Sequence, residues 1–360
     1  MSIAGLSAAQ IGALSVTAIQ GLSTTTIGAL SATQVAALSV TGIGALNNTQ
    51  VAALSTTQVR ALTTTQIPNF SSDIAFSSAQ LLALSGSQLG VFTATEVGNI
   101  NTTAIGSFST TQIRAFTAAN LSALDATQAD YLAVTQIAAL TTTQVAGLTT
   151  TDIGELSATQ IAALTTTQIA RLTTDALSVL DTTQVGALTA TTIRALTSTQ
   201  LNALGTADWA EFSTTQIAAM STTQVRNLSV ANVGDLSGAQ LEALTTAQVQ
   251  AVSSTNLSAL TETQIGAFST TQVRSLSTTQ LAAINATDVA EFTTTQLAAL
   301  TATQVRALTS TNMASLADTQ IAALTVTQLA SLSTTNLSAF SDTQIAALTN
   351  TQIAALTTTQ

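Results

Sequence analysis

The stretch LTTTQVAGLTTTDIGELSATQIAAL, residues 140–164, contains the pattern that decides the fold. A leucine recurs every eight residues within it, and each leucine is followed by Ser or Thr. Outward from this stretch in both directions, the approximate consensus LSTTQIAA runs through more than forty copies. We number the positions of this octapeptide from 1, the leucine, to 8. Such regularity indicates a repeat architecture rather than a closed globular core.

Positions 2 and 5 carry a signal for the start of a helix. Position 2 is Ser or Thr, and position 5 is usually Gln, so the two positions read S/T-x-x-Q, the pattern of a capping box. Positions 1 and 6 are apolar at the spacing of a hydrophobic staple, and Ala, a strong helix former, is frequent at positions 7 and 8. The main substitutes at position 2 also belong to the residues that cap helices: Asn47, Asn101, Asp125, Asp181 and Asn285.

Each repeat is therefore predicted to form one short helix of about seven residues. A helix of this length is unstable alone in water, because its few hydrogen bonds do not offset the cost of nucleation. Neighbouring repeats must bury each other's Leu and Ile side chains, as the units of solenoid proteins do. The sequence thus predicts an all-α solenoid with one helix per octapeptide and roughly three to four helices per superhelical turn.

A β-solenoid is the alternative fold. The many Thr residues favour strands, and Gln at position 5 is suited to a side-chain ladder between strands. Ala is depleted in strands, however, and the 17 glycines occupy no fixed corner position. We therefore expect helices.

The domain organisation is predicted to be a single continuous array over residues 1–360, with a register defect near 68–77. Pro68 falls at position 7, where it removes a helix hydrogen bond. The unit that follows, FSSDIA at residues 70–75, has only six residues. The octapeptide spacing then holds from Leu84 to Leu356, and together these features predict a kink or a shift in register.

Composition excludes most functional classes. The net charge is −10, and the seven basic residues are all Arg, so no basic stripe for nucleic acid is present. With no His, Cys or Lys, the chain lacks the commonest general base and metal ligands, and we predict no enzyme and no cofactor. No apolar run is long enough to span a membrane, and MSIAGLSAAQ at residues 1–10 has no basic region of a secretory signal.

Units like LTTTQIAAL, close to the consensus of this repeat, give the chain a resemblance to a known class of sequence. Over nearly its whole length it resembles the low-complexity octapeptide repeat regions of large bacterial surface and secreted proteins. That resemblance implies an extracellular or cell-surface location and a filamentous or adhesive role.

Three repeats contain paired acids at positions 5 and 8, and these are the candidate site residues. A separation of three residues puts both carboxylates on one side of a helix, where a hard cation such as calcium would find oxygen ligands. In the alternative interpretation, the first acid caps the helix start and the second is solvated. The three pairs are Asp152 with Glu155, Asp208 with Glu211, and Asp288 with Glu291.

Other unusual side chains have structural interpretations. Trp209 and Tyr131 are predicted to fill the core, and Tyr131 is expected to compensate for Ala129, which occupies the Ile position of its repeat. Six arginines share position 7, which we expect to face outward as a solvated stripe: Arg60, Arg114, Arg194, Arg226, Arg274 and Arg306.

These observations predict a non-enzymatic structural repeat protein, an elongated spacer, stalk or self-associating filament subunit. Near-identical repeats favour self-association, because each repeat presents the face that its neighbours bury. The alternative is a binding module that presents rows of Ser and Thr to ice, carbohydrate or a protein partner.

Overall fold

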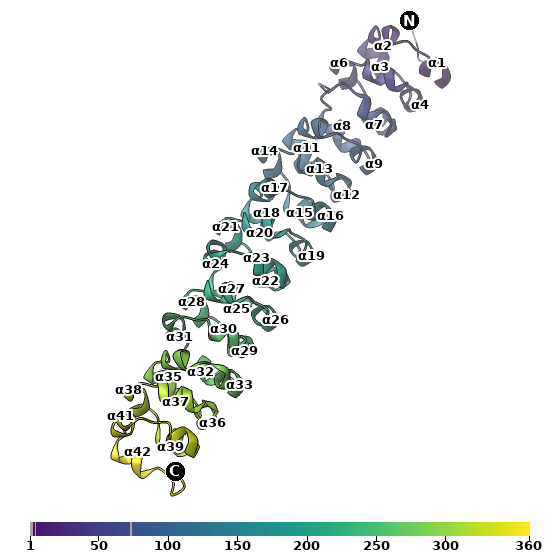
Figure 1. Ribbon diagram of the computed structural model, residues 1–360. Helices are drawn as coiled ribbons and strands as arrows, with labels where there is room; N and C mark the ends of the chain where they lie inside the picture. Colours follow the sequence, from purple (N-terminus) through teal and green to yellow (C-terminus); the bar gives the residue numbers. More distant parts are fainter. Residues whose placement is uncertain (1–2, 4, 73) are drawn as a thin grey trace. The chain divides into compact units, whose positions relative to one another are not determined.

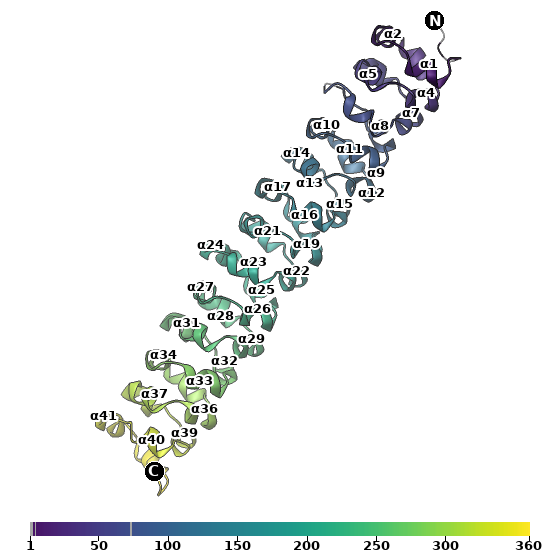
Figure 2. The ribbon, with the colours of Figure 1, turned by 45° about the vertical axis from the view of Figure 1, so that its right-hand side comes forward.

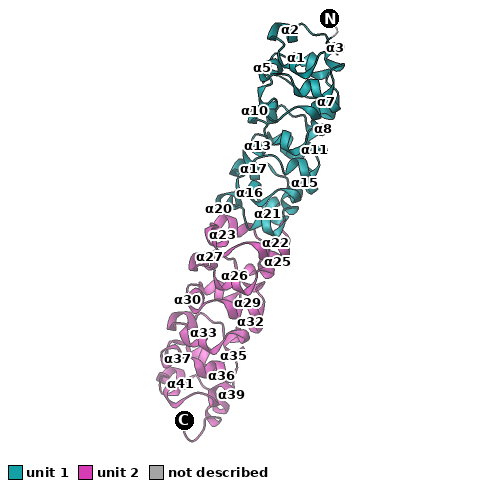
Figure 3. Ribbon diagram, turned by 90° about the vertical axis from the view of Figure 1, so that its right-hand side faces the viewer, with its two compact units in different colours: residues 1–187 teal, residues 188–360 magenta. Residues whose placement is uncertain are grey.

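The computed structural model describes residues 3, 5–72 and 74–360, and all regular secondary structure in this part of the chain is helical (Figures 1 and 2). The chain divides into two compact units, residues 1–187 and 188–360 (Figure 3). Each unit repeats short helices at the octapeptide spacing, which confirms the all-α solenoid. The β-solenoid is not supported.

The first unit contains α1 to α21 and one 3-10 helix, η1. Their bounds are α1 Ala8–Gly12, α2 Val16–Gln20, α3 Thr24–Gly28, α4 Ala32–Ala36, α5 Val40–Gly44, α6 Asn48–Ala52, α7 Thr56–Ala61, η1 Ile67–Asn69, α8 Ser78–Ala83, α9 Gly86–Leu89, α10 Ala94–Gly98, α11 Thr102–Ser107, α12 Thr110–Ile113, α13 Ala118–Leu121, α14 Ala126–Asp130, α15 Val134–Ala139, α16 Thr142–Ala146, α17 Thr150–Glu155, α18 Ala158–Ala162, α19 Thr166–Ile169, α20 Thr174–Ser178 and α21 Thr182–Gly186.

The second unit contains α22 to α42. Their bounds are α22 Ala190–Ala195, α23 Ser198–Ala203, α24 Thr206–Glu211, α25 Thr214–Ala219, α26 Thr222–Arg226, α27 Val230–Gly234, α28 Gly238–Glu242, α29 Thr246–Ala251, α30 Ser254–Leu257, α31 Glu262–Gly266, α32 Thr270–Ser275, α33 Thr278–Ala283, α34 Ala286–Ala290, α35 Thr294–Ala299, α36 Ala302–Ala307, α37 Ser310–Ser315, α38 Asp318–Ala322, α39 Val326–Ala330, α40 Thr334–Leu337, α41 Asp342–Ala346 and α42 Asn350–Ala354.

Helix α16 illustrates how each helix begins. Its N-cap Thr141 is extended, with φ −72° and ψ 155°, and its Oγ1 accepts a hydrogen bond from the backbone N–H of Gln144 at 3.1 Å. In return the Oε1 of Gln144 accepts from the backbone N–H of Thr141 at 2.8 Å. This reciprocal pair is a capping box, and its recurrence through both units confirms that prediction.

The helices are shorter than the predicted seven residues, since they have only four to six. At the end of α15, Leu140 already has φ −53° and ψ 141°, outside the helical region. Two extended residues, position 1 and the next N-cap, therefore separate many successive helices and redirect the chain.

The core of each unit is built from positions 1 and 6. In the repeat of α15, Ile137 is 1% exposed and Leu140 is 6% exposed. The backbone N–H of Leu140 donates to the carbonyl of Ile137 at 3.2 Å, so the helix ends by turning its leucine toward the same side as its isoleucine. Both apolar rows of the repeat are thereby buried, as predicted.

Helices stack on helices three repeats away. In the first unit α12 contacts α15 and α15 contacts α18, and in the second unit α26 contacts α29 and α29 contacts α32. One turn of each solenoid is therefore three octapeptides, the lower end of the predicted range.

The glutamine at position 5 joins successive turns. The Nε2 of Gln144 donates to the carbonyl oxygens of Ile113 and Phe116 at 2.9 and 2.7 Å, which are 31 and 28 residues earlier in the chain. These carbonyls belong to the last residue of α12 and to the leucine position after it. The carbonyl of Ile113 also accepts from the backbone N–H of Phe116 at 3.3 Å, so the amide adds a second bond there and satisfies the carbonyl at the leucine position. Gln144 is only 4% exposed. The same bonds recur along both units, and the sequence pattern did not predict them.

The six-residue unit interrupts the helices but not the stacking. Among the described residues, only η1 lies between α7 and α8, and Pro68 is in its first turn. Gln80 donates to Val51 and Leu54, 29 and 26 residues earlier, so the usual separations are shortened by two. Helix α8 still packs on α7. The missing residues are thus absorbed within the segment itself, of which Asp73 lies outside the described residues.

The hydrogen bonds from a position-5 side chain to the preceding turn form what we call a joint. Replacing Gln144 with Met should test the joint that this glutamine forms. The variant keeps the length of the side chain but removes three hydrogen bonds, those from the Thr141 N–H and to the carbonyls of Ile113 and Phe116. We expect the free energy of unfolding, measured by urea titration, to fall by about 2–4 kcal/mol.

Thr143→Ala is the matched control, because Thr143 is exposed on the same helix. It should change the free energy of unfolding by about 0.5 kcal/mol or less. Equal losses in the two variants would show that the amide does not stabilise the stack.

Candidate functional site

Four repeats have an acidic residue at position 5 in place of the usual glutamine, and so lack its amide donor. A carboxylate keeps the oxygen that accepts from the N-cap, but it has no N–H to donate to the preceding turn. The four acids at this position are Glu96, Asp152, Asp208 and Asp288.

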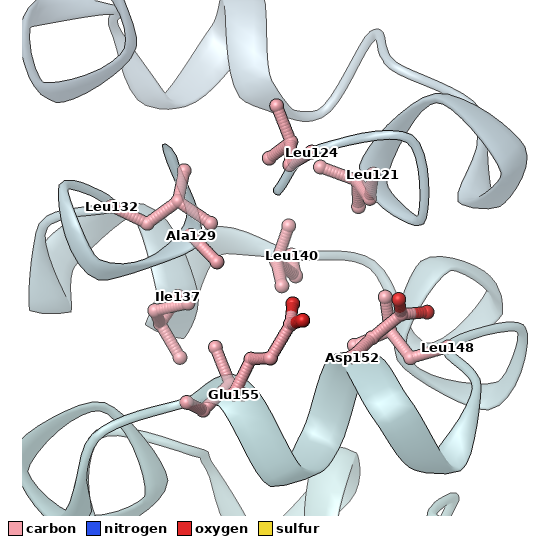
Figure 4. A pocket seen from close by; sticks show the side chains of 10 residues that line it. Leu121, Leu124, Ala129, Leu132, Ile137, Leu140, Leu148, Asp152 and Glu155 are labelled. Atoms are coloured by element: carbon pink, nitrogen blue, oxygen red, sulfur yellow. The ribbon is translucent and has the colours of Figure 1, made fainter. Parts of the chain in front are cut away.

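Asp152 and Glu155 both belong to α17, as the predicted pair requires. The Oδ2 of Asp152 accepts from the backbone N–H of Thr149 at 2.7 Å and from the hydroxyl of Ser122. Asp152 therefore caps its helix, as the alternative interpretation expects, and also bonds to the preceding turn. In Figure 4 the carboxylate of Glu155 points into a pocket toward Leu140, whereas that of Asp152 lies beside Leu148.

The pocket beneath Glu155 comes from a missing side chain. Ala129 stands at position 6, where the repeat normally has Ile, Val or Leu, and it lines the pocket with six leucines, Ile137 and both acids. The cavity volume is about 20 Å³. This is room for about one water molecule and is too small for an organic substrate.

Tyr131 does not fill this space. It is 53% exposed, so the prediction that it compensates for Ala129 is wrong. Position 8 lies at the C-cap of α14, from which the Tyr131 side chain extends into solvent rather than into the core. Trp209, at position 6, is 0% exposed and packs on Phe212 with ring centroids 5.5 Å apart, which confirms it as a core residue.

Asp208 and Glu211 lie at the two ends of α24. The Oδ2 of Asp208 accepts from the backbone N–H of Gly205 at 2.8 Å. Because Gly205 has no side chain to cap the helix, this bond is the remaining half of a capping box. Asp208 therefore stabilises the start of the helix, as the alternative interpretation expects of the first acid.

Asp288 and Glu291 each have a buried carboxylate oxygen. Asp288 in α34 is 6% exposed, and its Oδ2 is buried without a hydrogen-bond partner among the described residues. The Oε2 of Glu291, at the C-cap of α34, is also buried and finds no hydrogen-bond partner in the part of the chain that the structure describes. Burial raises the pKa of the Glu291 carboxyl above its ordinary value, with smaller contributions from the negative charges of Asp288 and Glu262.

Glu96 was not singled out by the sequence analysis, yet it resembles Asp288. Its Oε2 accepts from the N–H of Thr93 at 2.6 Å, which completes a capping box. Its Oε1 is buried and has no hydrogen-bond partner within residues 3, 5–72 and 74–360. In repeats with Gln at position 5, the Nε2 at this place donates to carbonyls of the preceding turn, which a carboxylate oxygen cannot do. The absence of an amide at position 5 was the sequence signal that marks such sites.

The structure keeps the members of each acid pair together but keeps the pairs on separate helices. Within residues 3, 5–72 and 74–360, no group of three or more His, Cys, Asp or Glu side chains is arranged to hold a metal ion. Calcium binding at any of the pairs stays a prediction.

The arginines at position 7 face outward, as predicted. All six are exposed. Arg60 and Arg194 each donate from Nε to a backbone carbonyl of a helix in the next turn, at 3.3 Å to Ala83 and 2.9 Å to Ala219. These contacts tie the surface of one turn to the next without an acidic partner.

The comparisons with known proteins agree with a repeat region. A protein-family model described as the ALTTAQ repeat matches residues 42–72, 203–238 and 321–358. A search of curated proteins finds none that matches the chain. In the part of the chain that the structure describes, no helix is long and apolar enough to cross a membrane.

Filling the cavity should stabilise the first unit. Ala129→Val adds two methyl groups beside Leu121 and Leu132, so we expect the free energy of unfolding to rise by about 0.5–2 kcal/mol in a urea titration. Ala138→Val, on the exposed side of α15, is the control and should bring no gain. A loss of stability in Ala129→Val would show that the space does not accommodate the larger side chain.

The raised pKa of Glu291 predicts a pH dependence with a definite sign. The Glu291 carboxyl binds its proton more tightly in the folded state than in the unfolded state. Its contribution to the free energy of unfolding is therefore favourable at acidic pH and is lost as pH rises through the raised pKa. Glu291→Gln should therefore unfold at a higher temperature than the parent near neutral pH, and the difference should vanish in acid. The exposed Glu242→Gln is the control, and parallel pH profiles for all three proteins would contradict the prediction.

Proposed function

We propose that this chain is a non-enzymatic structural repeat protein that acts as a spacer, stalk or filament subunit at a bacterial cell surface or outside the cell. The resemblance to repeat regions of bacterial surface and secreted proteins supports the location. The repeat itself supports the role.

The observation that carries this proposal is the use of the side chains. Positions 1 and 6 form the core, the hydroxyl at position 2 caps a helix, and the amide at position 5 joins two turns. Gln224, for example, accepts from the N–H of Ser221 at 2.7 Å and donates to the carbonyls of Ile193 and Leu196 at 2.8 Å. Few side chains of the repeat remain free to act on a substrate. What each added repeat contributes is further extension of the stack.

The residue types present in the chain support the proposal that it is not an enzyme. Serines and threonines are abundant, but no His or Lys is available to deprotonate them, and no Cys is present as an alternative nucleophile. The cavity beneath Glu155 has room for water only. We propose no cofactor.

Self-association follows from the equivalence of the turns. Each turn offers carbonyl oxygens and apolar side chains on one side and glutamine amides on the other. A turn of a second copy presents the same two surfaces. We therefore propose that copies stack on one another, which would extend a spacer into a filament.

The second candidate is a binding module for ice, carbohydrate or a protein surface, and exposed hydroxyls favour it. Thr142 and Thr143 on α16 are exposed, and so are Thr166 and Thr167 on α19, the helix stacked one turn away. Positions 3 and 4 thus form rows of threonines that capping does not occupy.

Removing one whole turn tests the spacer role. Deletion of residues 293–316 takes out three octapeptides of the second unit and leaves the repeat in phase. We expect a folded protein whose maximum dimension in small-angle scattering falls by about 8–10 Å, the spacing of packed helices.

The control is deletion of residues 293–312, which breaks the octapeptide phase and should reduce helix content and stability more than the longer deletion does. Scattering across a wide concentration range tests the filament role at the same time. An unchanged maximum dimension after the in-phase deletion contradicts the spacer, and a strictly monomeric profile at all concentrations contradicts self-association.

A further inference from the structure

Most joints between turns are chemically interchangeable. From α14 to α19, position 5 is Gln in five of six repeats, and the amide of each donates to backbone carbonyls, which every repeat possesses. A position-5 glutamine therefore does not distinguish its native partner repeat in the preceding turn from the repeat on either side of that partner. By this contact alone, a turn displaced by one octapeptide would stack almost equally well.

Asp152 is the exception in this run. It stands at position 5 of α17, and its carboxylate accepts from the hydroxyl of Ser122, which follows α13 and lies 30 residues earlier. The direction of the hydrogen bond is reversed relative to a glutamine joint, because the lower turn now supplies the donor. The partner is also a side chain, and so it differs between repeats.

The sequence couples these two residue types at a fixed distance. Serine occupies position 7 at Ser122, Ser178, Ser258 and Ser338. Aspartate occupies position 5 at three places, Asp152, Asp208 and Asp288, and each follows one of these serines by 30 residues. In the second unit the Oδ2 of Asp288 has no partner, so the hydrogen bond itself is observed between Ser122 and Asp152.

We propose that Ser122 and Asp152 form a register-setting pair, which joins α17 to the end of α13, specifies that α17 lies over α14, and rejects the displaced stack in which Asp152 would meet Asp130. In one displaced stack Asp152 meets Asp130, another carboxylate, and in the other it meets the exposed side chain of Arg114. The first displacement sets two like charges against each other, so the pair discriminates against it. In the second, the Arg114 guanidinium would itself donate to the carboxylate. A single polar residue that fixes register among otherwise equivalent contacts is well attested in coiled coils.

This inference does not depend on the proposed function, since it concerns which turn lies on which. It assigns Ser122 and Asp152 a role in specificity that differs from the contribution of a hydrogen bond to stability. The two roles separate in the double variant Ser122→Ala/Asp152→Gln, which exchanges the pair for a glutamine joint like its neighbours.

Disulfide trapping in the full chain, which has no cysteine, can report the register. Positions 3 and 8 of repeats one turn apart face each other: a Cβ atom added to Gly238 would lie 3.1 Å from the Cβ of Ala267. Cysteines at Ala126 and Glu155 occupy the same two positions across the joint of interest and mark the native register. Cysteines at Ala126 with Gly147, or at Ala126 with Ala163, mark the two displaced registers.

With Ser122 and Asp152 intact, oxidation after refolding should link the native pair and leave both displaced pairs at background. In Ser122→Ala/Asp152→Gln, the displaced pair Ala126 with Gly147, which marks the register that sets Asp152 against Asp130, should form several-fold above that background while helix content is retained. Ser122→Thr, which keeps the hydroxyl, should behave as the parent does. If the double variant links only the native pair, with the yield of the parent, the proposal is overturned.

Discussion

The buried amide of the position-5 glutamine is the interaction on which the rest of the structure depends. A helix of four to six residues leaves most of its backbone groups unpaired at both ends, and it cannot persist alone. The Oε1 of Gln144 serves the start of its own helix, while its Nε2 serves the end of α12 in the turn before. One side chain therefore compensates two helix ends, and it does so only when the turns are stacked.

The sequence contains the first half of this arrangement in readable form. Capping box, hydrophobic staple and apolar rows are local patterns, set by residues within one octapeptide, and the structure has them where they were predicted. The second half is not local. The acceptors of Gln144 lie 28 and 31 residues earlier, and that distance is fixed only once three helices close a turn. Nothing within a single repeat specifies that number.

The difference at Tyr131 has the same origin. This residue was expected to fill the volume left by Ala129, but the helix ends first and the tyrosine side chain lies outside the core. At the six-residue unit, where the sequence predicts a register defect, the hydrogen bonds of Gln80 span two residues fewer than usual, and α8 still packs on α7.

The acids at position 5 show how narrow the chemistry of this joint is. Asn312, with a shorter amide, still donates to the carbonyl of Ile284 at 3.0 Å. Asp288, nearly the same shape, has a buried oxygen in place of the nitrogen and finds no partner. Exchange of one atom thus separates a joint that closes from one that does not, and the candidate sites of this protein are defined by that exchange.

Stacking by single turns also has a mechanical consequence. Each turn within a unit is held by its neighbours alone, so tension along the stack would detach turns one after another rather than all at once. Three octapeptides drawn out to full extension would add roughly 80 Å of chain for each turn released. A stack built this way would extend in small, nearly equal steps under load. It would shorten again when the load falls, as the glutamine amides rebind their carbonyls, and so would dissipate mechanical energy.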